Sequence, residues 1–306
     1  GTFSQSETGT EVDDSVVLTK DFYPENVSGV ISYTPATDTE NGYFTIGTNE
    51  THYAFKDNAF TEFTEYNLTA ENGIIVKDSR NKTVTGKLSS VETYTLTSDK
   101  EFFVTIGTTT TLATKDNTTS KYTLTLESVT ADVTAEVIKT LTGDGSALNP
   151  IVINDESELR SFAMKDYNNS KVYVQIAKDI TLTKDVTLSS NTVLTGSGSI
   201  SGRKIIMNGE KAFLTVADNY TGTVDEILVS AGTSGFSIEG GTVTKLTNNY
   251  RVCDNHVNAV VKGGTVTELI DNGTVIVSGG VVTTLTANGQ AGGAEKGEYQ
   301  VYYTIT

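Results

Sequence analysis

Apolar and polar residues alternate over short stretches along most of the chain. In residues 121–127, the side chains of Tyr122, Leu124 and Leu126 are separated by threonines, and residues 91–97 follow the same period. Successive side chains of a strand point to opposite faces, so this alternation predicts strands with one buried and one wet face. Asn, Asp and Gly turns between them are typical of antiparallel sheets.

The N-terminal half contains an internal repeat. Tyr-Phe-Thr-Ile-Gly-Thr at 43–48 recurs as Phe-Val-Thr-Ile-Gly-Thr at 103–108. Lys-Asp-Asn at 56–58 and 115–117, then Tyr-x-Leu-Thr at 66–69 and 122–125, match in the same order. We therefore expect a flexible arm at 1–11 and a β-sandwich-like region at 12–140, duplicated at about 40–70 and 100–130. Chance similarity in a Thr-rich chain is the alternative, and one sandwich or two both fit.

One segment has helical rather than strand periodicity. Asp155 and Glu158 have the spacing of a capping box, and Leu159, Phe162 and Ala163 form one apolar stripe. This predicts a helix at 155–165. A turn-rich stretch at 141–150 and a short strand at 151–153 precede it, and short strands follow it.

A hexad recurs four times after this helix. It begins at Gly222, Gly241, Gly264 and Gly280, and reads Gly, Thr or Val, Val, two variable residues, then Ile or Leu. Repeats of about 20 residues made of short strands are typical of stacked solenoids. The Val and the Leu or Ile three residues later can both point inward only if the chain bends between them, and glycine permits a positive φ at a corner. We predict a short, right-handed parallel β-helix over 141–306, capped by the helix at 155–165.

The net charge of the chain limits the classes of binding partner that we expect. The formal net charge is −16, from 22 Lys+Arg and 38 Asp+Glu. Without a basic stripe, this balance disfavours nucleic acid and anionic membrane surfaces. No apolar run approaches the roughly 18 residues of a membrane span, so we expect no membrane insertion of this segment.

Cysteine usage bears on the compartment. The single cysteine, Cys253, excludes an intramolecular disulfide and reads as a buried or incidental thiol. Cysteine avoidance together with the Thr/Asn/Gly-rich strand character indicates an exported protein.

Short elements before the repeats match a known family. They are Gly-Asp-Gly at 143–145, Asn-Pro-Ile-Val-Ile at 149–153, Ser-Glu-Leu at 157–159, and first coils at 176–182. Residues 141–290 thereby resemble the β-helical, adhesin-like surface proteins of gut and other host-associated bacteria. The resemblance implies export, surface display and a helix that closes the open end of the β-helix. It names no ligand.

A catalytic site needs a separate test, because parallel β-helices also carry polysaccharide lyases and hydrolases. Such enzymes need clustered carboxylates, or an Arg or Lys base with calcium-binding acids. The best set that the sequence offers is Arg251, Asp254, His256 and Asp271, and nothing in the sequence brings these residues together.

The other charges of the repeats favour a solvated surface. Glu226, Lys245, Glu268 and Thr284 occupy the same hexad position. Coils in register would stack them as one outer column with weak ion pairing.

Aromatic platforms for sugar rings would have to come from tyrosine, because Trp is absent. The N-terminal half offers Tyr23, Tyr33, Tyr43, Tyr53 and Tyr66. Core packing on strand faces is the expectation for most of them.

Metal binding is not indicated. Calcium is conceivable at Asp13-Asp14 or at Asp144 and Ser146, but turn chemistry explains both places better. His52 and His256 are far apart in sequence.

Taken together, these features lead us to expect an extracellular cell-surface module for adhesion or binding, which recognises glycans or host matrix proteins. The alternatives are a polysaccharide lyase-like or glycoside hydrolase-like β-helix enzyme, or a degenerate relative, and a structural stalk. Clustered acids in a groove would favour the enzyme, and a shallow aromatic or polar patch would favour the binding module. The step from fold to function is an analogy.

Overall fold

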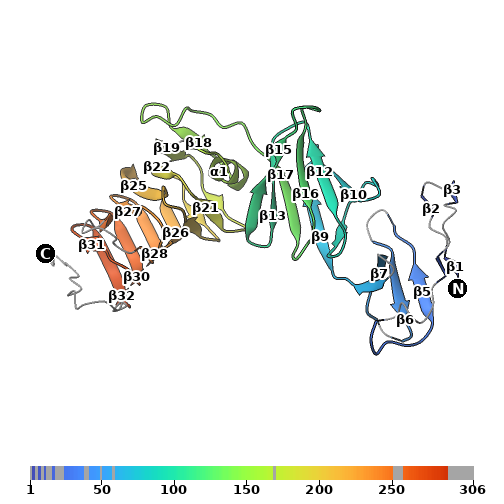
Figure 1. Ribbon diagram of the computed structural model, residues 1–306. Helices are drawn as coiled ribbons and strands as arrows, with labels where there is room; N and C mark the ends of the chain where they lie inside the picture. Colours follow the sequence, from blue (N-terminus) through green and yellow to red (C-terminus); the bar gives the residue numbers. More distant parts are fainter. Residues whose placement is uncertain are drawn as a thin grey trace. The chain divides into compact units, whose positions relative to one another are not determined.

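The chain folds into two compact units, residues 1–138 and 139–306. The computed structural model describes residues 2–3, 6–7, 10–11, 16–17, 24–37, 41–48, 50–56, 59–167, 170–250 and 258–288. Apart from one helix, α1, the regular elements of the described residues are strands, as predicted (Figure 1). The division between the units falls two residues before the expected boundary.

The first unit begins with small antiparallel pairings. Two-residue strands pair as β1 (Thr2–Phe3) with β4 (Val16–Val17), and β2 (Ser6–Glu7) with β3 (Thr10–Glu11). A four-stranded antiparallel meander follows, in the order β5 (Ile31–Thr34), β6 (Tyr43–Ile46), β7 (Tyr53–Lys56) and β8 (Ala59–Glu62). Its core is small: Ile46, Tyr53 and Phe60 are buried, with Phe44 and Phe55 packed against them.

The rest of the first unit is a β-sandwich. One sheet has the order β11 (Lys87–Ser89), β9 (Glu65–Ala70), β17 (Val133–Val137), β13 (Phe102–Ile106) and β14 (Thr109–Leu112). The other has the order β10 (Ile75–Asp78), β12 (Tyr94–Ser98), β16 (Tyr122–Leu126) and β15 (Thr114–Lys115). All neighbours are antiparallel except the parallel pair β17 and β9. Leu88, Tyr94, Leu96 and Phe102 lie fully buried between the sheets.

The structure places the two repeat copies of the first half in different settings. Gly47 and Gly107 end β6 and β13 with φ of 67° and 58°, so the matching Ile-Gly-Thr segments make similar turns. However, β6 lies in the meander and β13 in the sandwich, and β9, which the repeat assigned to the first copy, pairs within the sandwich. Local turn chemistry repeats here, whereas the sheets around it differ.

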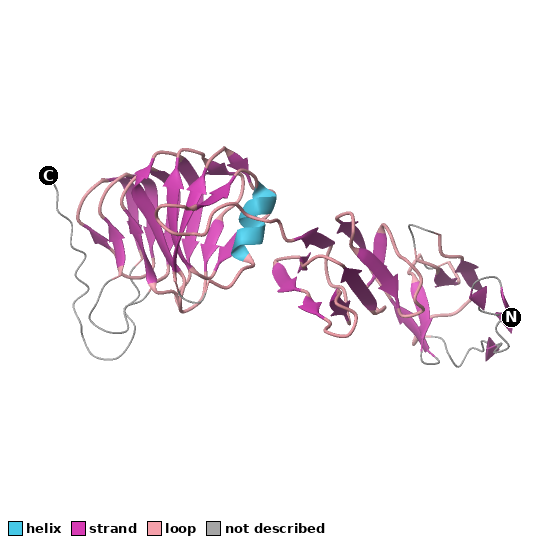
Figure 2. Cartoon of the chain, turned by 90° about the horizontal axis from the view of Figure 1, so that it is seen from above, coloured by secondary structure: helices cyan, strands magenta, loops and turns pink. Residues whose placement is uncertain are grey.

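The second unit is a parallel β-solenoid, as predicted, and it has about five turns. One sheet has the order β18 (Ile151–Ile153), β19 (Lys171–Ile176), β22 (Asn191–Gly196), β25 (Phe213–Tyr220), β27 (Gly235–Ile238), β29 (Ala259–Val261) and β31 (Ile276–Val277). The facing sheet has the order β20 (Ile180–Thr181), β23 (Ile200–Ser201), β26 (Thr223–Val229), β28 (Thr242–Asn248), β30 (Thr265–Asp271) and β32 (Val281–Ala287). Two further strands, β21 (Val186–Leu188) and β24 (Ile205–Met207), join this sheet through β26. The stacked strands are seen from above in Figure 2.

The repeated hexad shows the bend that its spacing predicts. In β28, Val243 and Leu246 are both fully buried although they lie three residues apart, and β26 and β30 have the same burial pattern. Equivalent positions pair coil on coil: Val224 with Val243, then Val243 with Val266. Each coil thus places a branched side chain directly over its equivalent in the next coil.

Pairs of adjacent glycines, at 240–241, 263–264 and 279–280, make one corner of the solenoid. Gly241, Gly264 and Gly280 have φ of 60°, 66° and 72°, whereas the first hexad glycine, Gly222, has no such φ. A Cβ at Gly264 or Gly280 would also clash with the backbone carbonyl of the preceding coil. These positions need glycine both for conformation and for space.

Helix α1 (Glu156–Ala163) closes the N-terminal end of the solenoid (Figure 2). Asp155 is the N-cap, and its Oδ1 accepts a hydrogen bond from the Glu158 backbone N–H at 2.9 Å. The Glu158 carboxylate accepts from the Asn154 N–H rather than from the N-cap residue itself. Leu159 and Phe162 are buried in the solenoid core, so the helix is a cap in the sense that the sequence predicted.

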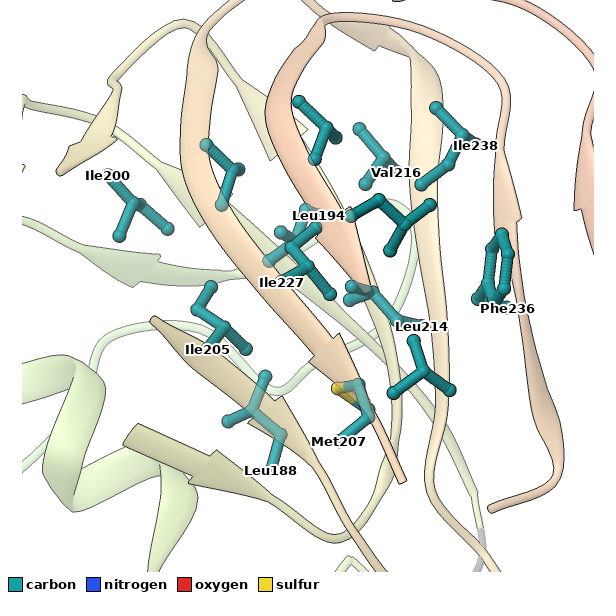
Figure 3. Close-up of a cluster of buried hydrophobic side chains, with 14 of the residues drawn as sticks. Leu188, Leu194, Ile200, Ile205, Met207, Leu214, Val216, Ile227, Phe236 and Ile238 are labelled. Carbon is teal, nitrogen blue, oxygen red and sulfur yellow. The ribbon is translucent and has the colours of Figure 1, made fainter. Parts of the chain in front are cut away.

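The solenoid core is one continuous cluster that runs from α1 toward the last coils. Figure 3 shows its centre, where Leu194, Leu214 and Ile227 point toward one another from different strands. Because each coil covers its neighbours, removing one inward side chain leaves a cavity bounded by two coils.

We expect Leu269→Ala to lower the free energy of unfolding of the second unit by about 2–5 kcal/mol, because Leu269 is 0% exposed. Urea unfolding followed by far-UV circular dichroism measures this change. The matched control is Leu148→Ala, at a side chain that is 98% exposed, which should change stability by less than about 0.5 kcal/mol. Equal losses in the two variants would contradict the burial of Leu269.

Candidate functional site

The catalytic candidates do not form a site among the described residues. Arg251, Asp254 and His256 lie outside them, as do Cys253 and the Asp13-Asp14 pair. Asp271 is buried at the end of β30, where its Oδ1 accepts hydrogen bonds from Asn248 Nδ2 at 2.7 Å and from the Gly273 N–H at 3.1 Å. These contacts give Asp271 a structural role inside the coil.

A ladder of polar side chains at the C-terminal ends of β28, β30 and β32 was not predicted from the sequence. Asn248 is fully buried; besides Asp271, its side chain bonds to the Thr274 carbonyl and to the Tyr250 N–H. The next position stacks Asn249, Asn272 and Asn288 through side-chain amide bonds of 2.8 and 3.0 Å. The signal was the Asn eight residues after the hexad glycine in three successive repeats, at Asn249, Asn272 and Asn288.

The predicted charge column is confirmed. Glu226 pairs in register with Lys245, Lys245 with Glu268, and Glu268 with Thr284. The Lys245 ammonium lies 4.0 Å from the Glu226 carboxylate, and both side chains are more than a third exposed. This is a weak surface pairing on an otherwise polar face, without the geometry of an acid–base pair.

A second polar cluster lies near the glycine corner. The Glu239 carboxylate accepts a hydrogen bond from the Ser237 hydroxyl at 2.8 Å and lies 3.2 Å from the Lys262 ammonium. These contacts, the Ser237 hydrogen bond first, lower the pKa of Glu239 from its ordinary value. The carboxylate is therefore held ionised, which suits a surface contact better than a proton donor.

In the described part of the chain, no three His, Cys, Asp or Glu side chains are grouped to hold a metal ion. Asp144 accepts a hydrogen bond from the Ser146 N–H at 2.8 Å, and contacts with Ser146 lower the pKa of its carboxyl. This is the turn chemistry expected for Asp144. Among the same residues, no helix has the length and apolar character needed to span a bilayer.

The structure separates the tyrosines into core and surface. Tyr53 is buried at 4% exposure, and Tyr66 packs against the sandwich core. Tyr43 stacks on His52 with ring centroids 3.6 Å apart, and Tyr33 is 46% exposed. Tyr23 lies outside the described residues.

Tyr33 belongs to an apolar face of the meander, which we call the aromatic face and define by Tyr33, Phe44, Phe55 and Phe60. Tyr33 pairs with Phe44 across β5 and β6, with ring centroids 4.8 Å apart, and Phe44 meets Phe60 edge-on at 5.4 Å. Phe60 is buried, and Phe44 and Phe55 are partly exposed. Tyr33 lies on the edge strand β5 and is the exposed member of the face. Ile46 and Tyr53 lie on the same side of the sheet, so the face is the partly exposed margin of the meander's own small core.

Two cavities of the first unit are small. One of about 80 Å³ lies beside Asn41, Asp78, Arg80 and Glu92. Another of about 220 Å³ is lined mainly by Val104, Ile106, Leu124, Leu126 and threonines. Both fall below the roughly 300–1,000 Å³ of typical ligand pockets.

Comparison with known proteins gives no match. No protein-family model, curated protein or solved structure is similar to this chain. Function therefore has to be argued from the surfaces themselves.

We expect Ser237→Ala to raise the pKa of Glu239, because the variant removes the contact that contributes most to its lowering. A lowered pKa means that Glu239 contributes stability above its unfolded-state pKa of about 4.5, and that this contribution is lost as the pH falls through the folded-state value. NMR titration of the Glu239 carboxyl measures the change. Ser189→Ala, at an exposed serine of the same unit, is the control, and an unchanged Glu239 titration in Ser237→Ala would contradict the assignment.

Proposed function

We propose that this protein is an extracellular cell-surface module for adhesion, and that the aromatic face of its meander binds glycans. The observation that carries the proposal is the half-exposed Tyr33 beside Phe44 on a small sheet. Display on a bacterial surface is part of the same proposal and rests on the resemblance of residues 141–290.

The chemistry of the aromatic face suits sugars. A pyranose ring has an apolar face of C–H groups, which packs on an aromatic ring, and hydroxyls at its edge, which need polar partners. Tyr33 supplies both a ring and a hydroxyl.

Mechanical support also favours binding at this place. Ile46, Tyr53 and Phe60 are buried on the same side of the sheet and pack beside the exposed rings, so these rings lose little side-chain freedom when a ligand binds. Recognition by a shallow face also agrees with the small volumes of the two cavities.

We expect Tyr33→Ala to weaken binding about tenfold or more on a glycan and host-matrix array, because exposed aromatic anchors of this kind contribute about 2 kcal/mol. The intact chain and the variant are compared on the same array. The matched control is Tyr173→Ala, which removes an outward-facing tyrosine of the solenoid and should leave binding unchanged.

Other results of this experiment would point elsewhere. Binding that is lost in Tyr173→Ala but kept in Tyr33→Ala would move recognition to the solenoid. An array that stays blank for the intact chain would contradict glycan and matrix binding and would favour a stalk.

A further inference from the structure

A lysine, a glutamate and an asparagine meet beside β11, the edge strand of the sandwich. Lys87 of β11 and Glu65 of β9 lie on the side of the sheet opposite the buried Leu88. The Lys87 ammonium lies 3.2 Å from Glu65 Oε2. Asn41, two residues before β6, donates from its Nδ2 to Glu65 Oε1 at 3.1 Å. One carboxylate thus holds an amine and a carboxamide side by side.

Further contacts fix the Asn41 carboxamide in this place. Its Nδ2 also donates to the Lys87 carbonyl oxygen at 3.4 Å, and the Asn41 backbone N–H donates to Glu65 Oε1 at 3.3 Å. Its Oδ1 accepts a hydrogen bond from the Tyr94 hydroxyl at 3.4 Å. Tyr94 is fully buried, and burial raises its pKa to about 12, so this hydroxyl keeps its proton. The carboxamide therefore has a donor at its oxygen and a carboxylate beside its nitrogen.

These are the groups that the attack of a lysine on an asparagine requires. A neutral amine is a nucleophile, and a carbonyl group becomes a better electrophile when its oxygen is hydrogen-bonded. A carboxylate between the two nitrogens can carry protons from one to the other. Reactants that the fold holds together react as though at very high concentration, which favours even a poor leaving group such as ammonia. The Glu65 side chain is only 15% exposed, so little water competes for its oxygens.

We propose that Lys87 and Asn41 form an intramolecular isopeptide bond, with Glu65 as the proton carrier. Glu65 Oε2 takes a proton from the Lys87 ammonium, and the freed electron pair of Nζ attacks Cγ of Asn41. The Tyr94 hydroxyl stabilises the negative charge that develops on Oδ1.

The reaction balances without any other reactant. The bond that forms is Nζ–Cγ, and the bond that breaks is Cγ–Nδ2. Of the three hydrogens of the Lys87 ammonium, one stays on the new amide. The other two pass through Glu65 to Nδ2, which already carries two and leaves as ammonium.

The bond fastens the meander to the sandwich at a second point. β8 already runs into β9 through residues 63–64, and the cross-link adds a covalent connection just before β6. A pulling force on the meander is then carried by both connections. The cross-link does not depend on what the aromatic face binds.

The mass of the intact, folded full-length chain tests the proposal. We expect it to lie below the mass calculated from the sequence by one ammonia, about 17 Da. Proteolysis should then yield a branched peptide that joins residues 41 and 87. Lys87→Arg keeps a cation beside Glu65 but lacks the amine, and Glu65→Gln removes the proton carrier, so both variants should keep their full mass. A folded chain of unchanged mass, without the branched peptide, would overturn the proposal.

The matched control is Lys77→Arg. Lys77 Nζ donates directly to Asn81 Oδ1 at 2.7 Å, so this lysine also lies beside an asparagine, but the pair is not bridged by Glu65. This variant should show the same loss of mass as the unchanged chain. Far-UV circular dichroism checks that each variant has folded.

One competing reaction gives the same loss of mass. Asn41 precedes Gly42, and an Asn-Gly pair can lose ammonia by closing a succinimide with its own backbone. That reaction does not need Lys87. A loss of ammonia that persists in Lys87→Arg, without a branched peptide in the unchanged chain, would therefore show that the proposal is wrong.

Discussion

The architecture of the second unit depends on parallel hydrogen bonding from coil to coil. A backbone group of one coil finds its partner only at the equivalent position of the next, so whatever one coil does at a given residue, its neighbour must repeat. This requirement stacks Val224, Val243 and Val266 in one inner column. It also confines loops of variable length to the corners. It also explains why glycine pairs recur, because two corner backbones lie in direct contact.

The first unit is held together differently, and this affects what its surfaces can do. Its sandwich buries large aromatic and aliphatic side chains between two sheets, whereas the meander has only a small core, and the partly exposed aromatic face is the margin of that core. An aromatic ring on a supported but uncovered sheet is available for stacking without rearrangement of the fold. The solenoid, by contrast, carries weakly paired charges such as Glu226 with Lys245 and Glu239 with Lys262 on its outer surface.

Much of the solenoid could be predicted from the sequence because the sequence features that specify it are local and recur in each coil. The hexad predicted the bend at Val243 and Leu246 and the stacked column of Glu226 with Lys245, and Asp155 with Glu158 predicted the start of α1. The first unit was less accessible because its pairings are not local: β9 joins β17, more than sixty residues later, and nothing in Tyr66 or Leu68 indicates that partner.

Burial of the aromatic residues could not be read from sequence either. Tyr33, Tyr43 and Tyr53 all lie on or beside alternating strands, yet one is half exposed, one stacks on His52, and one is buried. The outcome depends on which strands fold over each face.

The buried pair Asn248 and Asp271 makes the coils of this solenoid non-interchangeable. At the same inner position, the preceding coil has Val229 and the following one Ala287. If the coil that follows β28 carried valine in place of Asp271, the Asn248 amide would lose this partner in a dry interior, at a cost of about 1–3 kcal/mol. The repeats look alike in sequence, but the chain specifies their order as well as their shape, and this guards against a coil slipping by one turn during folding.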